Sequence, residues 1–425
     1  MTASDTIITL ELGHYRLRER IGGSAYGVIW RAEGPRGTRD VALKLINEAH
    51  MARALPAQRE RWIASAENEI TFLQLLEPWD ERHIVRLLDS GWHNGLPVLA
   101  LELLDCDLAR HLKALRGRGE RLPLARLLSW MAQLNQALAK VHQYGWRYLD
   151  LKPANVLVDA HLGAVKLADF GTNRRLSALG EHSYAGTANW QAPEQFFPAG
   201  GGGYATGRQS DYFALGALFY FMATGGKQLR YCGECGQAYR EHHTNGADVL
   251  LRRHGGLPAI LQADEEASFV QAISDAADGG QERRPFTSAP ATHAPAYARP
   301  DATANAPANA THATPGAHTT RAPHTAQAAL RLLRHLLAAA PQARPIHAID
   351  ISRQLAAIAQ AGGSESSERS NSAPARPDLQ PGGARASGGN WLPPRQVGLA
   401  PAHATHWWHA TAGQVQASWH SDAEA

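Results

Sequence analysis

Cysteine is scarce in this chain of 425 residues, which contains three. So few cysteines exclude a disulfide framework as the main source of stability and favour a reducing compartment. The longest apolar stretch, residues 212–226, is too short to cross a bilayer and is typical of a buried helix. Residues 1–13 also lack the basic and apolar segments of a secretory signal. We therefore expect a cytoplasmic protein without a membrane span.

Charged residues are also sparse, at 19%, and the net charge is only +3. Because no block of Lys or Arg stands out, we expect no nucleic-acid partner. Hydrophobic residues make up 44% of the chain, which supports a sizeable core. The length suits one large domain or two ordinary ones.

Two stretches have almost no aliphatic side chains. Residues 278–326 are rich in Ala, Pro, Thr and His, and residues 361–425 are rich in Ser, Gly, Pro and Ala. Such segments cannot bury enough apolar area to offset their ordering entropy, so we predict that both are disordered. The tail also contains tryptophans that could dock on a partner, although they could equally be incidental. They are Trp391, Trp407, Trp408 and Trp419.

A glycine-rich turn, "IGGSAYGVI" at 21–29, lies between the first two predicted strands. Backbone N–H groups of such a turn can approach phosphates closely, but a plain hairpin gives the same pattern. Lys44 follows in "VALK", where a fixed cation would suit phosphate groups. It needs a carboxylate to hold its position. Glu69 in the next helical stretch is the candidate, because Glu67 would face elsewhere on that helix.

The segment "RYLDLKPANVLVD" at 147–159 carries three polar side chains at short spacing. Asp150 could accept a hydroxyl proton, and Lys152 could neutralise charge on a moving phosphoryl group. Asn155 offers an oxygen to a divalent cation. Asp169 in "ADFG" adds a hard oxygen ligand suited to Mg²⁺.

Taken together and in this order, these segments resemble the eukaryotic-type Ser/Thr protein kinase family. The segments "APE" at 192–194, "SDYFALG" at 210–216 and "PQARP" at 341–345 extend the resemblance. It covers residues 15–278 and 327–360 and implies an α+β, bilobal, protein-kinase-like fold. After an N-terminal segment, 1–14, we expect a β-rich N-lobe over 15–105. A mainly helical C-lobe would follow over 106–360, with insertions at about 227–246 and 278–326.

The resemblance also implies a role for each matching residue, with ATP and Mg²⁺ as cofactors and Mn²⁺ as a substitute. Asp150 and Lys152 would be catalytic, together with Lys44 and Glu69, while Asn155 and Asp169 would hold the metal. Thr187 would contact the catalytic Asp and Lys, as in kinases that act on Ser or Thr. Three residues would be structural: Asp211 would anchor the catalytic loop, and Arg344 would pair with Glu194. The residues expected to contact ATP are Ile21, Gly22, Gly23, Ser24, Gly27, Ile29, Ala42, Lys44, Glu102, Leu104 and Leu157.

The chain departs from the family pattern at three positions. Ser24 replaces a glycine, and Tyr148 replaces a histidine that packs against the Phe of "DFG". Leu149 replaces an arginine that normally pairs with a phosphate on the activation segment. We therefore predict a protein kinase that also autophosphorylates and does not depend on this usual switch. The alternative is a pseudokinase that acts as a nucleotide-binding scaffold. The sequence does not identify the protein substrate.

A second cluster, "YCGECGQAYREHH" at 231–243, suggests zinc. Cys232 and Cys235 form a C-x-x-C pair whose glycines would allow a tight knuckle. With His242 and His243 they could complete four ligands. The spacing fits no common zinc finger, and a reduced, metal-free cysteine pair explains the same pattern.

Overall fold

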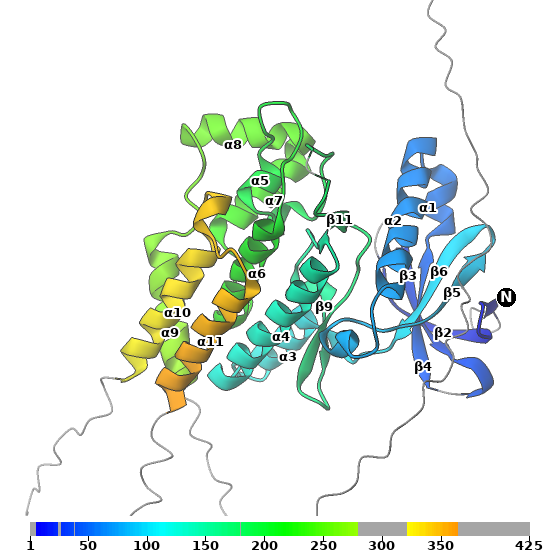
Figure 1. Ribbon diagram of the computed structural model, residues 1–425, viewed down its shortest axis with the longest axis horizontal. Coiled ribbons are helices and arrows are strands. Elements are labelled where there is room, and N and C mark those ends of the chain that lie inside the picture. The colour runs from blue at the N-terminus through cyan, green and yellow to red at the C-terminus, as the bar shows by residue number, and fades with distance from the viewer. Residues whose placement is uncertain (1–5, 24–26, 38, 179, 279–320, 364–425) are drawn as a thin grey trace, which may run out of the picture. The chain divides into compact units, whose positions relative to one another are not determined.

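The structure is a computed structural model, and it describes residues 6–23, 27–37, 39–178, 180–278 and 321–363 (Figure 1). The predicted disordered tail with its tryptophans lies outside these residues, apart from its first three positions. Most of the predicted loop at 278–326 also lies outside them, but residues 321–326 belong to the helix Arg321–Leu336 and residues 361–363 to the helix Ala348–Gly363. The prediction of disorder was wrong at these positions. Ser24 is likewise not described.

The N-terminal part contains a six-stranded antiparallel sheet with the order β1-β2-β3-β4-β6-β5. Alternate side chains of β4 and β6 enter two different cores, because successive residues of a strand point to opposite faces. Leu43, Val98 and Ala100 are buried on one face, while Ala42 and Leu101 join the core on the other. The strands are β1 (Ile7–Thr9), β2 (His14–Gly23), β3 (Gly27–Glu33), β4 (Asp40–Ile46), β5 (Leu87–His93) and β6 (Leu96–Glu102).

Two helices accompany this sheet, α1 (Glu48–Arg53) and α2 (Pro56–Gln74). The longer helix, α2, contacts β5 and β6 and carries buried Phe72 and Leu73 into the main core. It also carries the buried Glu69, which therefore points from the helix towards the sheet and the loops beyond it.

From residue 106 the chain is mainly helical and is built around α6 (Arg208–Ala223), which is buried along nearly its whole length. This is the buried helix that the apolar run predicted. Three helices contact it directly, and Figure 1 colours them cyan to yellow: α4 (Leu124–Gln143), α9 (Ala263–Asp278) and α10 (Arg321–Leu336). The other helices of this part are α3 (Leu108–Gly117), α5 (Pro193–Phe196), α7 (Arg230–His242), α8 (Gly246–His254) and α11 (Ala348–Gly363).

Two small sheets hold the loops between α3 and α5. One has the order β10-β9-β7 and the other pairs β11 with β8. In the described part of the chain, no helix has both the length and the apolar character needed to cross a bilayer. The short strands are β7 (Cys106–Asp107), β8 (Trp146–Arg147), β9 (Val156–Asp159), β10 (Ala164–Leu167) and β11 (Arg174–Arg175).

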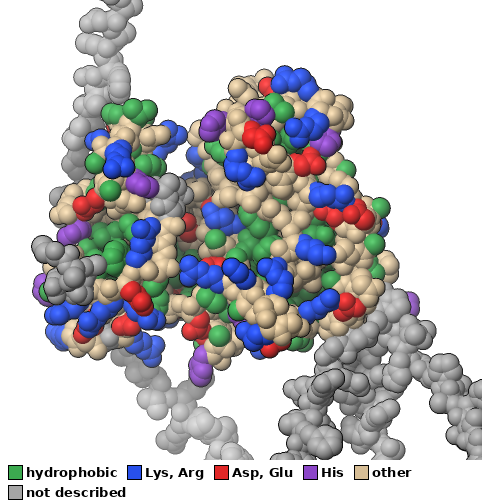
Figure 2. Space-filling model, turned by 180° about the vertical axis from the view of Figure 1, so that it is seen from behind, with side chains coloured by type: hydrophobic (Ala, Val, Ile, Leu, Met, Phe, Trp, Pro, Cys, Tyr) green, Lys and Arg blue, Asp and Glu red, His purple; other side chains and the backbone are tan. Residues whose placement is uncertain are grey.

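Basic and acidic side chains are interspersed on the face shown in Figure 2, with hydrophobic side chains between them.

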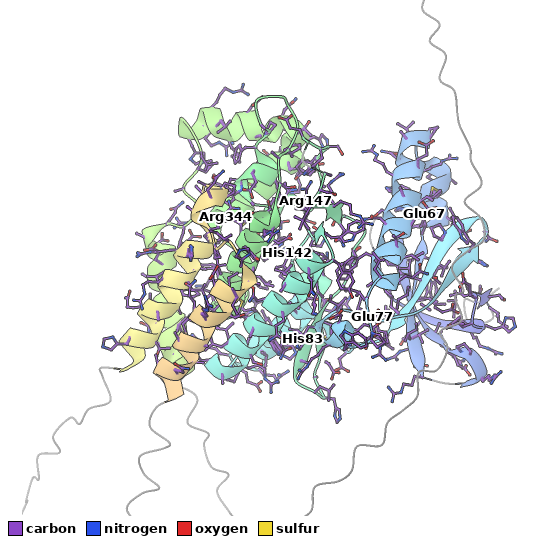
Figure 3. The ribbon with its side chains drawn as sticks, viewed as in Figure 1. Glu67, Glu77, His83, His142, Arg147 and Arg344 are labelled. Carbon is purple, nitrogen blue, oxygen red and sulfur yellow. The ribbon has the colours of Figure 1, made fainter. Side chains whose placement is uncertain are left out.

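A buried ion pair connects the start of α5 to the loop before α11. Arg344 donates from Nη1 and Nη2 to the two carboxylate oxygens of Glu194, at 2.7 and 2.9 Å. The same guanidinium donates to the backbone carbonyls of Ala338, Ala339 and Gln209. All its donors thus serve neighbouring segments of the helical part, where Figure 3 labels Arg344.

The structure corrects the expectation of a cysteine knuckle. Cys232 and Cys235 lie one helical turn apart in α7, and both are buried against the main core. His242 and His243 are exposed at the other end of α7. Among the described residues, no group of three or more His, Cys, Asp or Glu is placed to hold a metal ion. Burial raises the pKa of Cys235 to about 12 and raises the pKa of Cys232 well above its ordinary value, so both thiols stay protonated. The zinc hypothesis therefore has no support.

Replacing Arg344 with Met should lower the free energy of unfolding by about 3–5 kcal/mol, because Glu194 would keep a buried charge without its partner. Urea denaturation measures this change. Arg353→Met is the matched control, because that side chain is 74% exposed. It should change stability by less than about 0.5 kcal/mol. Equal effects of the two substitutions would contradict the role assigned to Arg344.

Thiol labelling tests the position of the cysteines. Cys106 is half-buried, so an excess of an aromatic disulfide reagent should react with it in the folded protein. Cys232 and Cys235 should react only after guanidinium is added. Cys106→Ser is the control and should remove the reaction of the folded protein. Fast labelling of that variant under native conditions would show that α7 does not bury its thiols.

Candidate active site

The glycine-rich turn joins β2 to β3, and Gly22 pairs with Ile29 across these strands. Gly23 has a φ of 159°, and a Cβ there would lie 2.8 Å from the carbonyl oxygen of Gly27. A side chain would therefore push the two strands apart. This close approach of the two strands explains why a glycine stands at the end of β2.

Lys44 of β4 binds two carboxylates at once. Its Nζ lies 2.6 Å from Oε2 of Glu69 and 2.8 Å from Oδ1 of Asp169. Glu67 is exposed on α2, where Figure 3 labels it, so Glu69 is the partner as the helical spacing indicated. The ammonium group thus connects the sheet, α2 and the segment after β10.

Burial and charge compete at this triad. Burial disfavours the ammonium form of Lys44, but Asp169 and Glu69 outweigh it and raise the pKa of the lysine. Burial likewise opposes ionisation of Asp169, yet Lys44 holds the pKa of that carboxyl below its ordinary value. Lys44 and Asp169 therefore stay charged at neutral pH.

The residues expected around an adenine ring come from two sheets. Ala42 pairs with Leu101 across β4 and β6, while Leu157 pairs with Asp107 across β7 and β9. Glu102 accepts hydrogen bonds from Lys166 at 2.5 Å and from the backbone of Arg86 at 2.8 Å. Its side chain is therefore occupied, and its backbone N–H donates to the carbonyl of Arg86 at 3.0 Å. Leu104 is half-buried.

Asp150 stands at the centre of a hydrogen-bond network. Its Oδ1 accepts a bond from Thr187 Oγ1 at 2.7 Å, and its Oδ2 accepts one from Lys152 Nζ at 2.7 Å. Asn155 Nδ2 donates to the same Oδ2 at 3.0 Å, and Lys152 also donates to Thr187 at 2.8 Å. The structure thus brings these four predicted residues into one cluster.

Burial raises the pKa of Asp150 above its ordinary value, although Lys152 and the Thr187 hydroxyl oppose this shift. A carboxylate with a raised pKa is a stronger base than a solvated aspartate. The group is thus suited to accept a proton from a hydroxyl held beside it.

Asp211 of α6 fixes the backbone next to Asp150. Its two oxygens accept the backbone N–H groups of Tyr148 at 2.9 Å and of Leu149 at 2.7 Å. His142 of α4, labelled in Figure 3, lies 2.8 Å from the same carboxylate. These bonds hold Leu149 at a φ of 67°, a conformation that costs a branched residue energy.

Tyr148 packs on the ring of Phe170, as the sequence predicted for this departure. Their ring centroids lie 5.2 Å apart in an edge-on arrangement, and Phe72 of α2 stacks on the other side of Phe170 at 4.7 Å. The Tyr148 hydroxyl also donates to the carbonyl of Ala168. Tyr148 therefore holds the segment that carries Asp169 through both its ring and its hydroxyl group.

The structure brings together the backbones of Asn155 and Asp169, the two residues predicted to hold Mg²⁺. The backbone N–H of Ala168 donates to the carbonyl of Asn155 at 2.9 Å, so the residue before Asp169 is fixed beside Asn155. An amide oxygen and a carboxylate are hard ligands of the kind Mg²⁺ prefers. The Asp169 side chain is 35% exposed, which leaves room for a ligand beside Lys44.

One positioning residue escaped the sequence analysis. Gln195 donates from Nε2 to the carbonyl of Leu149 at 3.0 Å, and its Oε1 accepts the backbone N–H of Ala192. It directly follows Glu194, but its amide carries no motif of its own. The sequence pattern contains no signal that would have identified it.

Comparisons with known proteins agree with this geometry. A family model described as "Protein kinase domain" matches residues 15–348. The chain is 31% identical over 217 residues to cyclin-dependent kinase B2-1 of Oryza sativa subsp. japonica, which covers 49% of this chain and 63% of that protein. It is 30% identical over 211 residues to cyclin-dependent kinase 20 of Danio rerio, covering 49% and 56%. With the serine/threonine-protein kinase ULK3 of Rattus norvegicus it shares 33% identity over 190 residues, covering 43% and 37%. The chain thus matches less than two thirds of the length of each of these relatives.

Proposed function

The chain belongs to the protein kinase family, and on that basis we propose that it transfers the γ-phosphoryl group of ATP to Ser or Thr hydroxyls of proteins. The observation that carries the proposal is the buried Asp150 carboxylate, bound to both Lys152 and Thr187. This combination provides a base and a cation within one hydrogen-bond network. The relatives named as serine/threonine kinases support the choice of acceptor.

Asp150 would act on the acceptor side of the reaction. The substrate hydroxyl oxygen forms a bond to the γ-phosphorus, the bond from that phosphorus to the β,γ-bridging oxygen breaks, and Asp150 takes the hydroxyl proton. Lys152 lies 2.7 Å from Asp150 and would balance charge as the phosphoryl group moves. Thr187 holds both side chains and, by its position, restricts the space for the acceptor residue.

Lys44 and the glycine-rich turn would act on the nucleotide side. Lys44 is held by Glu69 and Asp169, so its ammonium group needs little rearrangement before it can meet a phosphate. Asn155 and Asp169 would hold Mg²⁺, which supplies positive charge to the phosphate oxygens when bound. Ala42 and Leu157 would enclose the adenine ring from opposite sides.

The arrangement at Leu149 supports activity without the usual phosphate-dependent arginine. Leu149 is 3% exposed, and its backbone is held by Asp211 and Gln195. Asp150 is therefore positioned by internal hydrogen bonds, whether or not the activation segment carries a phosphate. We include autophosphorylation in the proposal, because Ser177 and Ser183 are exposed on that segment.

A cytoplasmic location is also part of the proposal. Cys106, Cys232 and Cys235 are all unpaired in the structure. Free thiols of this kind are typical of proteins in a reducing compartment.

Transfer of labelled phosphate from ATP to a generic basic protein, in the presence of Mg²⁺, tests the activity. Asp150→Asn should lower the rate by about 10²–10⁴-fold, because the amide cannot accept the proton. Lys44→Met should also abolish most of the label. Lys113→Met is the control, because Lys113 is exposed on α3. Phosphoamino-acid analysis of the product should show Ser or Thr.

The same assay can also contradict the proposed activity. If folded wild-type protein binds ATP but transfers no label, the chain is a nucleotide-binding scaffold and the proposed activity is wrong. A melting temperature that rises with ATP and Mg²⁺ would identify that case.

The raised pKa of Asp150 predicts how kcat depends on pH. Only the deprotonated carboxylate accepts a proton, so kcat should fall on acidification through this raised pKa. The decline should start above the ordinary range of an aspartate, about 3.9. Lys152→Gln removes the cation that opposes the shift, so its residual activity should decline at a still higher pH.

Profiles of kcat against pH for the wild type and Lys152→Gln measure this effect. Lys113→Gln should match the wild-type profile in shape. An acid limb that stays in place or moves to lower pH in Lys152→Gln would contradict the assignment of Asp150 as the base.

A further inference from the structure

A run of four glycines, residues 200–203, forms a loop between α5 and α6, the tetraglycine loop. Glycine loses more conformational freedom on folding than any other residue, so a run of four is costly to fix in one conformation. The loop is closed at its base, where the backbone N–H of Ala199 donates to the carbonyl of Gly203 at 2.7 Å. A contact from another segment of the chain helps to hold this conformation.

That contact is the carboxylate of Glu181, which lies on the activation segment before α5. The backbone N–H of Gly203 donates to its Oε2 at 2.7 Å, and the backbone N–H of Gly201 donates to its Oε1 at 3.2 Å. Gly202 separates the two donors and has a φ of 84°. Backbone N–H groups on a turn of this kind form a concave site for an anion, and here a carboxylate of the same chain fills it.

The glycines that surround the carboxylate have no room for a side chain. A Cβ at Gly201 would lie 2.6 Å from Oε2 of Glu181, and a Cβ at Gly203 would lie 2.5 Å from the Cβ of Glu181. Gly200 differs, because no described atom beyond its chain neighbours lies within 4 Å of a Cβ placed there. The need for glycine is therefore specific to the positions that enclose the carboxylate.

The residue after Glu181 attaches the activation segment to the same loop. His182 and Tyr204 exchange two backbone hydrogen bonds, at 3.1 and 3.0 Å. His182 Nε2 also lies 2.7 Å from Oγ1 of Thr206. Backbone and side chains together thus join residues 181 and 182 to the loop that leads into α6.

The stretch that follows is held by side-chain contacts. The ring of Tyr184 stacks on Tyr239 of α7, with 4.6 Å between the ring centroids. The Tyr184 hydroxyl donates to Oε1 of Gln191 at 2.7 Å, and Gln191 donates from Nε2 to the carbonyl of Ala185 at 2.6 Å. The activation segment is therefore fixed at successive positions from Glu181 onwards.

This ordered stretch ends at the catalytic loop. Gly186 lies against the carbonyl of Leu149, where a Cβ would come within 2.5 Å of the oxygen. Thr187 then donates its hydroxyl to Asp150 at 2.7 Å. The anchor at Glu181 and the contact with Asp150 are thus the two ends of one short segment.

We propose that Glu181 is a positioning residue for the acceptor side of the proposed reaction. Its carboxylate, bound by the tetraglycine loop, keeps the segment that carries Thr187 in place for a protein substrate. The contact uses backbone N–H groups, so it needs neither a phosphate nor an arginine. The inference rests on the proposed function for its effect on phosphate transfer, while the contact itself can be measured without turnover.

The kinetic test compares Glu181→Ala with the wild type, using the generic basic protein as acceptor. The KM for the acceptor should rise about tenfold, because a released segment must be ordered each time an acceptor binds. The kcat at saturating acceptor and the KM for ATP should stay within about twofold, since a bound acceptor restores the segment. Glu181→Gln keeps one acceptor oxygen and should lie between the two. An unchanged acceptor KM, or an equal rise in the KM for ATP, would overturn the proposal.

A double-mutant cycle tests the role of the loop. Gly201→Ala should raise the acceptor KM as Glu181→Ala does, because its Cβ displaces the carboxylate. In the Glu181→Ala background it should add nothing, since no carboxylate remains to displace. Gly200→Ala is the matched control and should leave the KM unchanged. Effects of Glu181→Ala and Gly201→Ala that multiply in the double variant would show that the glycine and the carboxylate act independently, contrary to the proposal.

Hydrogen–deuterium exchange of the full chain without nucleotide separates this inference from the proposed function. In Glu181→Ala, amides in peptides covering residues 180–187 and 199–206 should exchange about tenfold faster, while peptides of α6 keep the wild-type rate. Unchanged exchange in the two regions would overturn the inference whether or not the wild type transfers phosphate. An equal increase along the whole chain would also overturn it, since that indicates general destabilisation. A wild type that transfers no phosphate contradicts the proposed function instead.

Discussion

The carboxylate of Asp211 is the interaction on which the catalytic loop depends. It sits on α6, the most completely buried helix of the described structure, and both oxygens are used by the backbone of residues 148 and 149. A loop with a residue at positive φ would relax if these bonds were lost. The geometry of Asp150 is therefore set by a buried carboxylate on a different element of the fold.

A second constraint is that the charged side chains of the site pair with one another. Lys44 is shared by Glu69 and Asp169, and Asp150 is shared by Lys152, Asn155 and Thr187. Burying any one of these charged groups alone would cost desolvation free energy, and the attraction of its partners offsets that cost. Much of the electrostatic arrangement needed for the proposed phosphoryl transfer is thus already required by folding. The stack of Phe72, Phe170 and Tyr148 adds the apolar support that keeps the two clusters together.

Sequence reasoning worked best where a residue type and its spacing carry chemistry. Lys44, Asp150, Lys152 and Asp169 have few substitutes for their roles, so the order of these motifs predicted both the family and the contacts. It failed at the cysteine pair, because a C-x-x-C spacing of three also places two side chains on one face of a helix. The core of the helical part, which no local pattern shows, decided that Cys232 and Cys235 face inward. Gln195 and His142 were missed for the same reason, because their roles depend on contacts with residues far away in the sequence.

The leucine at position 149, where the family has an arginine, follows from the same cost of burying a charge without a partner. Leu149 is buried next to Asp211 and Gln195, in a place where an arginine without an anion would face the desolvation cost that Arg147 and Arg174 already carry. A third guanidinium in this region would add repulsion without a partner to offset it. An apolar residue at 149 therefore suits a chain in which Arg147 and Arg174 face each other on the short ladder of β8 and β11.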